Sequence, residues 1–275
     1  MTEFLSLHEP LFRLTIFATV LAAMVLWELA APRRILRMSR WQRWPTNMAL
    51  SALGTLLVRL ALPLVAVATA IEAERQGLGL FNWAGAPTVL AIPLSMIMLD
   101  ALVYAQHVIF HRLGLLWRLH RVHHADPDFD VTTGIRFHPV EILISMCIKI
   151  LAVALLGAPV VAVILFEVLL NAAAMFNHSN VRLPVAVDRI LRWLVVTPDM
   201  HRVHHSIHQD EHDMNFGFSL SIWDHLFGTY RAEPRDGHEA MQIGLAAFPA
   251  PVPAGLGWSL INPLSNAAGG RERRI

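Results

Sequence analysis

Three histidine clusters lie between His107 and His205 and read HVIFH at residues 107–111, HRVHH at residues 120–124 and HRVHH at residues 201–205. On a helix, residues three and four positions apart share one face, so each cluster presents its imidazoles together. One such pair occurs often by chance, but three clusters in one chain form a strong signal. The stretch therefore predicts helices that converge on a metal site with eight ligands: His107, His111, His120, His123, His124, His201, His204 and His205.

The composition indicates that these helices belong to a membrane protein. Of the 275 residues, 55% are hydrophobic and only 16% are charged, and the mean hydropathy of +0.48 lies outside the range of ordinary soluble domains. The formal net charge of +1 and the lack of a long basic run argue against a nucleic-acid partner. The single cysteine, Cys147, excludes an internal disulfide, so histidine must supply the metal ligands.

Three apolar runs are long enough to cross a bilayer, at residues 11–31, 48–71 and 88–106. Pro63 is expected to kink the second span without ending it. Residues 32–43 carry five arginines, no acid and Trp41, which is typical of a cytoplasmic interface. We therefore expect this segment, the histidine clusters and Arg271–Arg274 in the cytoplasm, and the N-terminus outside.

A hydrophobic hairpin follows the second cluster, with arms at residues 139–156 and 159–177. At about 1.5 Å per residue each arm is roughly 28 Å long, or one hydrocarbon thickness. His138 and His178 flank the two arms at equal distances from the turn, so both should return to the level of the clusters and join the ligands. Lys149 and Glu167 lie eight residues from the turn on opposite arms, and we expect them to pair, because unpaired charges in a bilayer are costly.

These segments predict an all-α integral membrane helical bundle, with three spans plus a membrane hairpin and a cytosolic helical cap that carries the histidine clusters. Residues 180–196 are amphipathic and are expected to lie on the cytoplasmic surface. We expect one domain over residues 1–275. Its parts are N-terminal spans in residues 1–87, the histidine core in residues 88–230 and a tail in residues 231–275 that covers the cap.

Several polar residues accompany the histidines. Asp100 and Tyr104 share a helical face with the first cluster, which makes them candidates near a substrate channel. The Asp100 carboxylate is expected to hydrogen-bond a ligating imidazole or line a polar cavity, or alternatively to pack the helices. His208 and His212 are not expected to be ligands. Other carboxylates and amides are candidates to orient the imidazoles: Asp126, Asn180, Asp213, Asn215 and Asp224.

The order and spacing of the three clusters, followed by Asn215-Phe216-Gly217 and by residues 223–229, resemble the fatty acid hydroxylase and sterol desaturase superfamily. The resemblance covers about residues 100–229. Val108 departs from it, since many members have arginine after the first histidine. The first 90 residues and the tail do not indicate a subfamily.

The resemblance implies a membrane-bound di-iron oxygenase that hydroxylates or desaturates a lipid, with O₂ as co-substrate. Sterol, fatty acyl, carotenoid and ether lipids all remain possible substrates. Ten histidines are enough to give each of two iron ions about five ligands. The electrons would come from a separate ferredoxin- or cytochrome-type protein. A multi-pass protein of the bacterial inner membrane is expected, with its histidine site facing the cytoplasm.

Two other classes of function are less consistent with the sequence. A zinc-dependent membrane hydrolase would be expected to carry a general-base glutamate inside a ligand motif, as in His-Glu-x-x-His, and no cluster contains one. A non-enzymatic metal transporter or sensor would be expected to place its ligands at mid-membrane in broken helices. Here the clusters gather toward one face.

Overall fold

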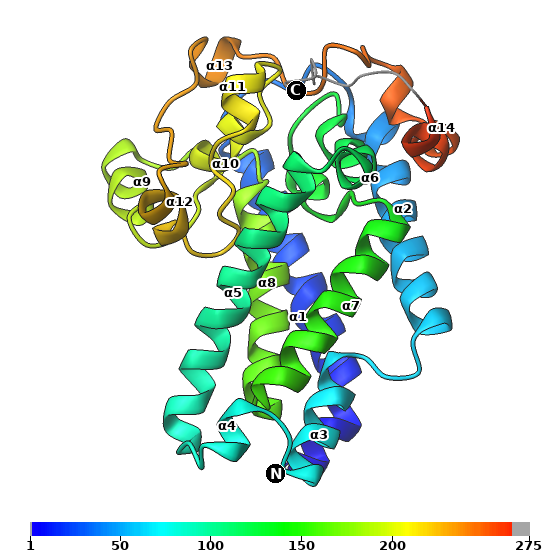
Figure 1. Cartoon of the computed structure of the whole chain (residues 1–275). Coiled ribbons are helices and arrows are strands. Elements are labelled where there is room, and N and C mark those ends of the chain that lie inside the picture. Colours follow the sequence, from blue (N-terminus) through cyan, green and yellow to red (C-terminus); the bar gives the residue numbers. More distant parts are fainter. Residues whose placement is uncertain (1, 266–275) are drawn as a thin grey trace.

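The computed structural model describes residues 2–265, with side chains from residue 11 onward. Every regular element in that range is a helix, and extended backbone pairs only at three isolated bridges. Long helices form a tall bundle, and most of the short helices gather into a head at one end of it (Figure 1). The N-terminus lies at the end of the bundle opposite the head. This architecture confirms the predicted all-α membrane bundle with a helical cap.

The bundle consists of six long helices and one short helix that joins two of them. Five segments are long and apolar enough to cross a membrane, judged by length and composition: Leu11–Ala30, Arg40–Trp83, Thr88–Arg112, Pro139–Leu156 and Val160–Asn177. They coincide with the apolar runs expected for three spans and the two hairpin arms. The bundle helices are α1 (Thr2–Ala30), α2 (Arg40–Ala61), α3 (Ala66–Gln76), α4 (Leu80–Trp83), α5 (Thr88–Arg112), α7 (Pro139–Leu156) and α8 (Val160–Asn177).

The second apolar run, expected to be kinked at Pro63, is interrupted there instead, although Arg40–Trp83 still counts as one candidate span. α2 starts at Arg40 and ends at Ala61, and α3 starts only at Ala66. Leu62 is extended, with φ −116° and ψ 122°. It precedes Pro63, whose ring disfavours the helical conformation of the residue before it and which lacks an N–H for the helical ladder.

The hairpin forms as predicted. Pro139 opens α7 in its first turn, and Gly157 ends it in the left-handed conformation with φ 62°. The Lys149 Nζ atom lies 2.8 Å from Glu167 Oε1, which confirms the predicted pair. Arg13 of α1 approaches the other carboxylate oxygen of Glu167 at 2.7 Å. Three buried or half-buried charges therefore meet inside the bundle.

The head consists of short helices separated by loops. Its elements are α6 (Gly114–His124), η1 (Val131–Ile135), α9 (Val185–Leu191), α10 (Pro198–His204), α11 (Gln209–His212), α12 (Ile222–Phe227), α13 (Gly237–Ala240), η2 (Val252–Ala254), α14 (Leu256–Ile261) and η3 (Asn262–Leu264). The tail covers the head up to residue 265, because the Arg121 guanidinium of α6 donates to the Asn262 carbonyl at 2.6 Å. Arg271–Arg274 lie outside the described residues.

A buried ionic network fastens the head to the bundle. The Arg43 guanidinium of α2 lies 2.7 Å from Asp126 and 2.7 Å from Asp130, and none of the three side chains is exposed. Arg136 donates to Asn47 Oδ1 at 2.7 Å and to the Val122 carbonyl at 2.9 Å. Buried charges are tolerated when they are paired and hydrogen-bonded in this way. The network sets the position of α6 relative to the membrane helices.

Part of the predicted amphipathic segment is helical. α9 covers seven residues of the expected 180–196, and large apolar side chains around it are exposed, among them Ile190 (72%) and Trp193 (70%). Leu226 and Phe227 at the end of α12 are exposed as well. Exposed apolar side chains next to a membrane bundle fit a surface that rests on lipid, and this location remains a prediction.

Candidate metal centre

The structure brings nine histidines into two buried groups at the junction of bundle and head. Within each group, one ring nitrogen of every histidine lies within 4.8 Å of the others. The first group draws on α5, α6 and α10, and the second on α6, the end of α8 and α10. The first histidine group comprises His107, His111, His120, His124 and His204, and the second comprises His123, His178, His201 and His205.

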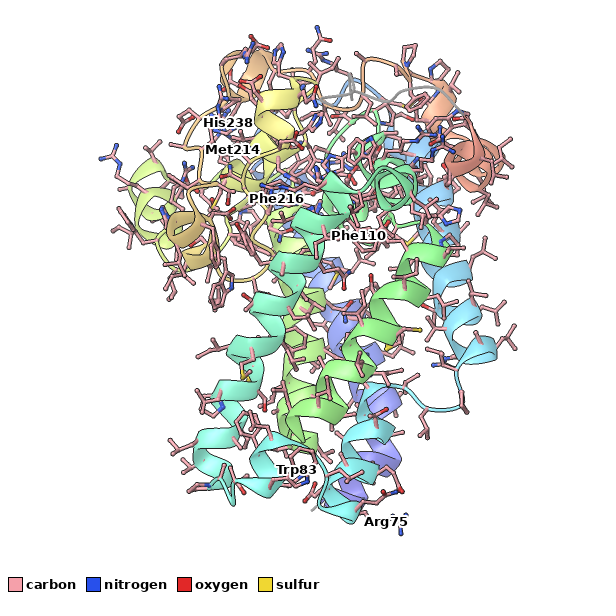
Figure 2. The ribbon with its side chains drawn as sticks, viewed as in Figure 1. Arg75, Trp83, Phe110, Met214, Phe216 and His238 are labelled. Atoms are coloured by element: carbon pink, nitrogen blue, oxygen red, sulfur yellow. The ribbon has the colours of Figure 1, made fainter. Side chains whose placement is uncertain are left out.

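Aromatic side chains pack around the groups. Phe110 and Phe216 lie at the junction of bundle and head, whereas Trp83 and Arg75 lie at the far end of the bundle (Figure 2). The Phe216 ring centroid is 5.0 Å from that of His111, and the Phe137 ring stacks on His123 at 4.4 Å. These rings keep water away from the imidazoles on two sides.

The imidazoles point their Nε2 atoms at one another. His107 Nε2 lies 3.1 Å from His120 Nε2 and 2.9 Å from His204 Nε2 in the first group. In the second group, His178 Nε2 lies 3.2 Å from His123 Nε2 and 3.0 Å from that of His201. In all of the grouped rings except His205, Nε2 therefore lies close to the Nε2 atom of another ring of its group.

The outward nitrogens determine which tautomer these rings adopt. The Nδ1 atoms lie within hydrogen-bonding distance of four backbone carbonyls, and a carbonyl can only accept, so Nδ1 carries the proton and Nε2 a lone pair. Facing lone pairs about 3 Å apart repel unless a cation lies among them, so the donor set fits bound metal. The four bonds join His107 to Phe216 O (2.8 Å), His123 to Arg136 O (3.0 Å), His178 to Ala174 O (2.8 Å) and His204 to Met214 O (2.7 Å).

Burial keeps these rings neutral. It lowers the pKa of His120 to about 3, and it likewise lowers the pKa of His178 to about 3. The pKa values of His124, His204 and His205 also lie well below the ordinary value, mainly through burial and further through neighbouring imidazoles. Neutral imidazole is the form that binds metal, so these groups do not need to lose protons first.

Two carboxylates hold first-group histidines. Glu141 Oε1 accepts from His120 Nδ1 at 2.6 Å, and Asp213 Oδ1 lies 3.3 Å from His111 Nδ1. Asp213 was predicted to orient an imidazole, and the structure places it beside one. Glu141 was missed, because an acid in the first turn of an apolar helix is also typical of a helix start. The sequence feature that could have identified Glu141 is its short distance along the chain from the second cluster, because it lies at the start of the long helix that follows α6.

Asn215 and Asp224 act on His107 through the backbone between them. Asn215 adopts φ 54°, and its side chain donates to the carbonyls of Met200 and Arg231. The Asp224 carboxylate accepts the N–H groups of Phe216 and Gly217, both at 2.8 Å. These bonds aim the Phe216 carbonyl at the His107 ring. Burial raises the pKa of Asp224 to about 6.

Within the described part of the chain, the other predicted polar residues form no hydrogen bond to a ring of the two groups. Asp126 binds Arg43, and Asn180 exchanges hydrogen bonds with the backbone of Arg34. Asp100 accepts from Trp223 Nε1 at 2.8 Å, and Tyr104 lies 2.9 Å from Thr229 Oγ1. For Asp100 the packing alternative therefore describes the structure, because its helical face turns toward the loops of the head.

His138 lies apart from both groups. As the residue that caps α7, it accepts the Val140 N–H through Nδ1, and its Nε2 lies 3.2 Å from the Leu260 carbonyl. The hairpin symmetry placed it at the right depth, but its ring turns back onto its own helix. His178, at the other end of the hairpin, joins the second group. His208 and His212 lie outside both groups.

A cavity of about 290 Å³ connects the first histidine group with the interior of the bundle. At the head end, His107, His120, His123 and Glu141 border it. Apolar side chains of α5, α7 and α8 line its middle, including Leu102, Met146 and Leu170. Neither Asp100 nor Tyr104 lines it. Such a cavity suits a largely apolar molecule that reaches toward the histidines from the membrane.

Fold and site together define a helical membrane protein with two buried histidine groups at one end of its bundle that could hold metal ions. The chain belongs to the fatty acid hydroxylase family, whose model matches residues 92–229, half of the chain. The matched region contains all nine grouped histidines and the Asn215–Asp224 segment. Membership confirms the resemblance found from the spacing of the clusters.

Curated relatives of the chain act on several lipids. It is 30% identical over 149 residues to an ornithine lipid hydroxylase of Rhizobium tropici, covering 54% of this chain and 44% of that protein. It is 29% identical over 145 residues to an alkylglycerol monooxygenase of Xenopus tropicalis (51% and 30%). It is 23% identical over 170 residues to a cholesterol 25-hydroxylase of Rattus norvegicus (56% and 55%). The matches thus span less than two thirds of each relative, and no solved structure matches the chain.

Proposed function

We propose that this protein is a membrane-bound, metal-dependent lipid oxygenase that hydroxylates an unactivated C–H bond. The observation that carries the proposal is the pair of all-histidine groups at the inner end of an apolar cavity within the membrane bundle. The named activities of these relatives, two hydroxylases and a monooxygenase, favour hydroxylation over desaturation.

The two histidine groups would hold two iron ions, five histidines for one and four for the other. Imidazole binds iron, zinc and copper alike, so the choice of iron rests on the family rather than on the ligands. When bound, such a centre supplies the chemistry that reduces O₂ with two external electrons and oxidises a C–H bond. The ligands of each group come from three separate helices, so neither group is complete without the whole junction.

The residues of the chain prepare this centre in three ways. Backbone carbonyls and the carboxylates of Glu141 and Asp213 orient the rings and keep Nε2 directed inward. Phe137 and Phe216 exclude water from the rings. The cavity holds the lipid so that one of its carbons lies against the first group.

The same proposal includes a separate electron-donor protein of the ferredoxin or cytochrome type and a place in the bacterial inner membrane, with the head in the cytoplasm. Sidedness is testable with a matched pair of exposed glutamines in a Cys147→Ala background: Gln76 at the far end of the bundle and Gln209 in the head. An impermeant thiol reagent on intact cells should label Gln76→Cys and spare Gln209→Cys. The reverse pattern would contradict a cytoplasmic centre.

The decisive experiment compares lipid extracts of cells with and without the gene by mass spectrometry. A lipid that gains one oxygen only when the intact gene, O₂ and a reductant are present is the expected result. His205→Ala should abolish that product and lower the metal content, and His208→Ala, outside both groups and half-buried, is the matched control. A product that forms without O₂ would favour a zinc hydrolase, and bound metal without any product a transporter or sensor.

A further inference from the structure

Two short helices of the head bury charged side chains and expose apolar ones. Every residue of α9 and α12 is described, and the only buried residue of each helix is an aspartate, Asp188 in α9 and Asp224 in α12. Asp188 forms an ion pair with Arg192. Asp224 accepts two backbone N–H groups of the loop before α12, both at 2.8 Å. A surface helix of a soluble protein has the opposite arrangement, with its apolar side inside and its charges in water.

The exposed apolar side chains of the two helices lie next to one another. The Trp193 ring, just after α9, stacks on the His225 ring of α12 at 4.8 Å, and the Ser221 N–H donates to the Leu194 carbonyl at 3.2 Å. Soluble proteins rarely expose so many large apolar side chains in one place. Six of them, each between 48% and 72% exposed, are called here the apolar patch: Ile190, Trp193, Leu194, Ile222, Leu226 and Phe227.

Contacts with α5 determine the depth of this patch. Trp223 Nε1 donates to Asp100 Oδ2 at 2.8 Å. The Phe227 ring stacks on the Tyr104 ring, with 5.5 Å between the centroids. Asp100 lies six residues, and Tyr104 two residues, before the end of the apolar run at residues 88–106. At about 1.5 Å per residue, α12 is therefore attached about 9 Å and about 3 Å inside the apolar run.

This depth matches that of a helix inserted into a membrane interface, which buries its apolar face by about 5–10 Å. Figure 1 shows α9 and α12 at the lower edge of the head, beside α5. Ile97 and Ile109 of α5 are exposed and apolar, so lipid would surround α5 both below and above the attachment points of α12. Acyl chains are therefore the surroundings that the apolar patch would meet.

We infer that α9 and α12 are inserted into the bilayer beside α5, with the apolar patch among the acyl chains of the leaflet on the side of the head. Arg189 is exposed on α9 and can extend its charged end to the lipid phosphates while its stem stays in the apolar layer. The partner of this surface is the bilayer. The inference goes beyond the proposed function and needs neither bound metal nor a particular substrate.

Spin labels measure the depth of the patch. Leu226→Cys, in a Cys147→Ala background, carries a nitroxide on the full-length metal-loaded protein in nanodiscs of phosphatidylcholine and phosphatidylglycerol. Labels on Ile97→Cys and Ile109→Cys calibrate depth along α5, and a label on Gln209→Cys, exposed in α11, reports contact with water. Electron paramagnetic resonance compares collisions with O₂, which concentrates among acyl chains, with collisions with a water-soluble nickel chelate.

The Leu226→Cys label should lose the nickel collisions that the Gln209→Cys label shows and keep those with O₂. Its depth should lie between the depths of Ile97→Cys and Ile109→Cys, because its neighbour Phe227 stacks on Tyr104. Ile190→Cys on α9 should also lose the nickel collisions. It replaces Leu226→Cys if circular dichroism shows that the latter does not fold.

Two results would overturn the inference. Nickel collisions at Leu226→Cys and Ile190→Cys as frequent as at Gln209→Cys would show that the patch faces water. Labels that meet neither reagent would show that protein, such as a second copy of the chain, covers the patch instead of lipid. The measurement involves no turnover, so a protein that oxidises no lipid could still have the inserted helices, and an active oxygenase could still lack them.

Discussion

Removal of the Glu141 carboxylate should weaken metal binding in the first histidine group without unfolding the bundle. Glu141 is 4% exposed, and its Oε1 lies 2.6 Å from His120 Nδ1. A hydrogen bond to a charged group contributes about 1.5–3 kcal/mol, which corresponds to roughly 10- to 150-fold in affinity. Loss of such a partner of a metal ligand typically costs about 10- to 100-fold. We therefore expect Glu141→Leu to lower the affinity of one metal ion by about 10- to 100-fold.

The Glu141→Gln variant tests how much of the loss in metal affinity is due to the charge of Glu141. A glutamine oxygen can still accept the His120 proton, but as a neutral acceptor, so the loss should be smaller, at most about tenfold. Glu74, exposed at the far end of the bundle, supplies the control Glu74→Gln, which should change nothing.

The assay is competition for iron or zinc against a chelator of known affinity, with two binding steps resolved per chain. Only one step should weaken in Glu141→Leu, because the second histidine group does not contact Glu141. Circular dichroism in detergent checks that the helices persist. Unchanged affinity in Glu141→Leu with retained helicity would refute the orienting role of this carboxylate, and equal weakening of both steps would refute two separate groups.

Three further predictions test the same structure. His178→Ala should lose one of two metal ions, whereas His138→Ala should keep both, as measured by metal analysis of purified protein. Without metal, the folded state should lose stability as pH falls below about 6.5 toward 3. Burial lowers the pKa of His120 to about 3, so in this range the unfolded chain binds more protons than the folded one. The melting temperature should be lower at pH 5 than at pH 7.5, and a higher value at pH 5 would contradict the prediction. Gly217→Ala should reduce both stability and metal content, because a Cβ there would meet Asp224 Oδ2 at 2.6 Å, and an unchanged melting temperature would show that the loop yields.

Hydropathy and histidine spacing were enough to predict most of the bundle and the histidines that gather in the two groups. Apolar runs of bilayer length form spans in any arrangement, because lipid leaves the backbone no other way to satisfy its hydrogen bonds. Histidines at i, i+3 and i+4 share a face whatever that face meets. The same counting along the hairpin arms correctly predicted the pairing of Lys149 with Glu167.

The sequence predicted the break in the second apolar run only incompletely. Pro63 was recognised as a site of disruption, but a proline in a membrane helix can either kink or end it. Here the extended Leu62 before Pro63 separates α2 from α3, and both helices pack on α7. The proline alone does not specify which of the two occurs.

The division of the histidines into groups of five and four was decided only by the tertiary structure. His123 and His124 are adjacent in sequence, yet they join different groups, because consecutive residues of a helix point about 100° apart. His138 and His178 are equivalent in sequence distance, but one caps its own helix and the other faces the second group. Sequence periodicity determines the face and depth of a side chain, whereas its partners follow from how separate helices pack against one another.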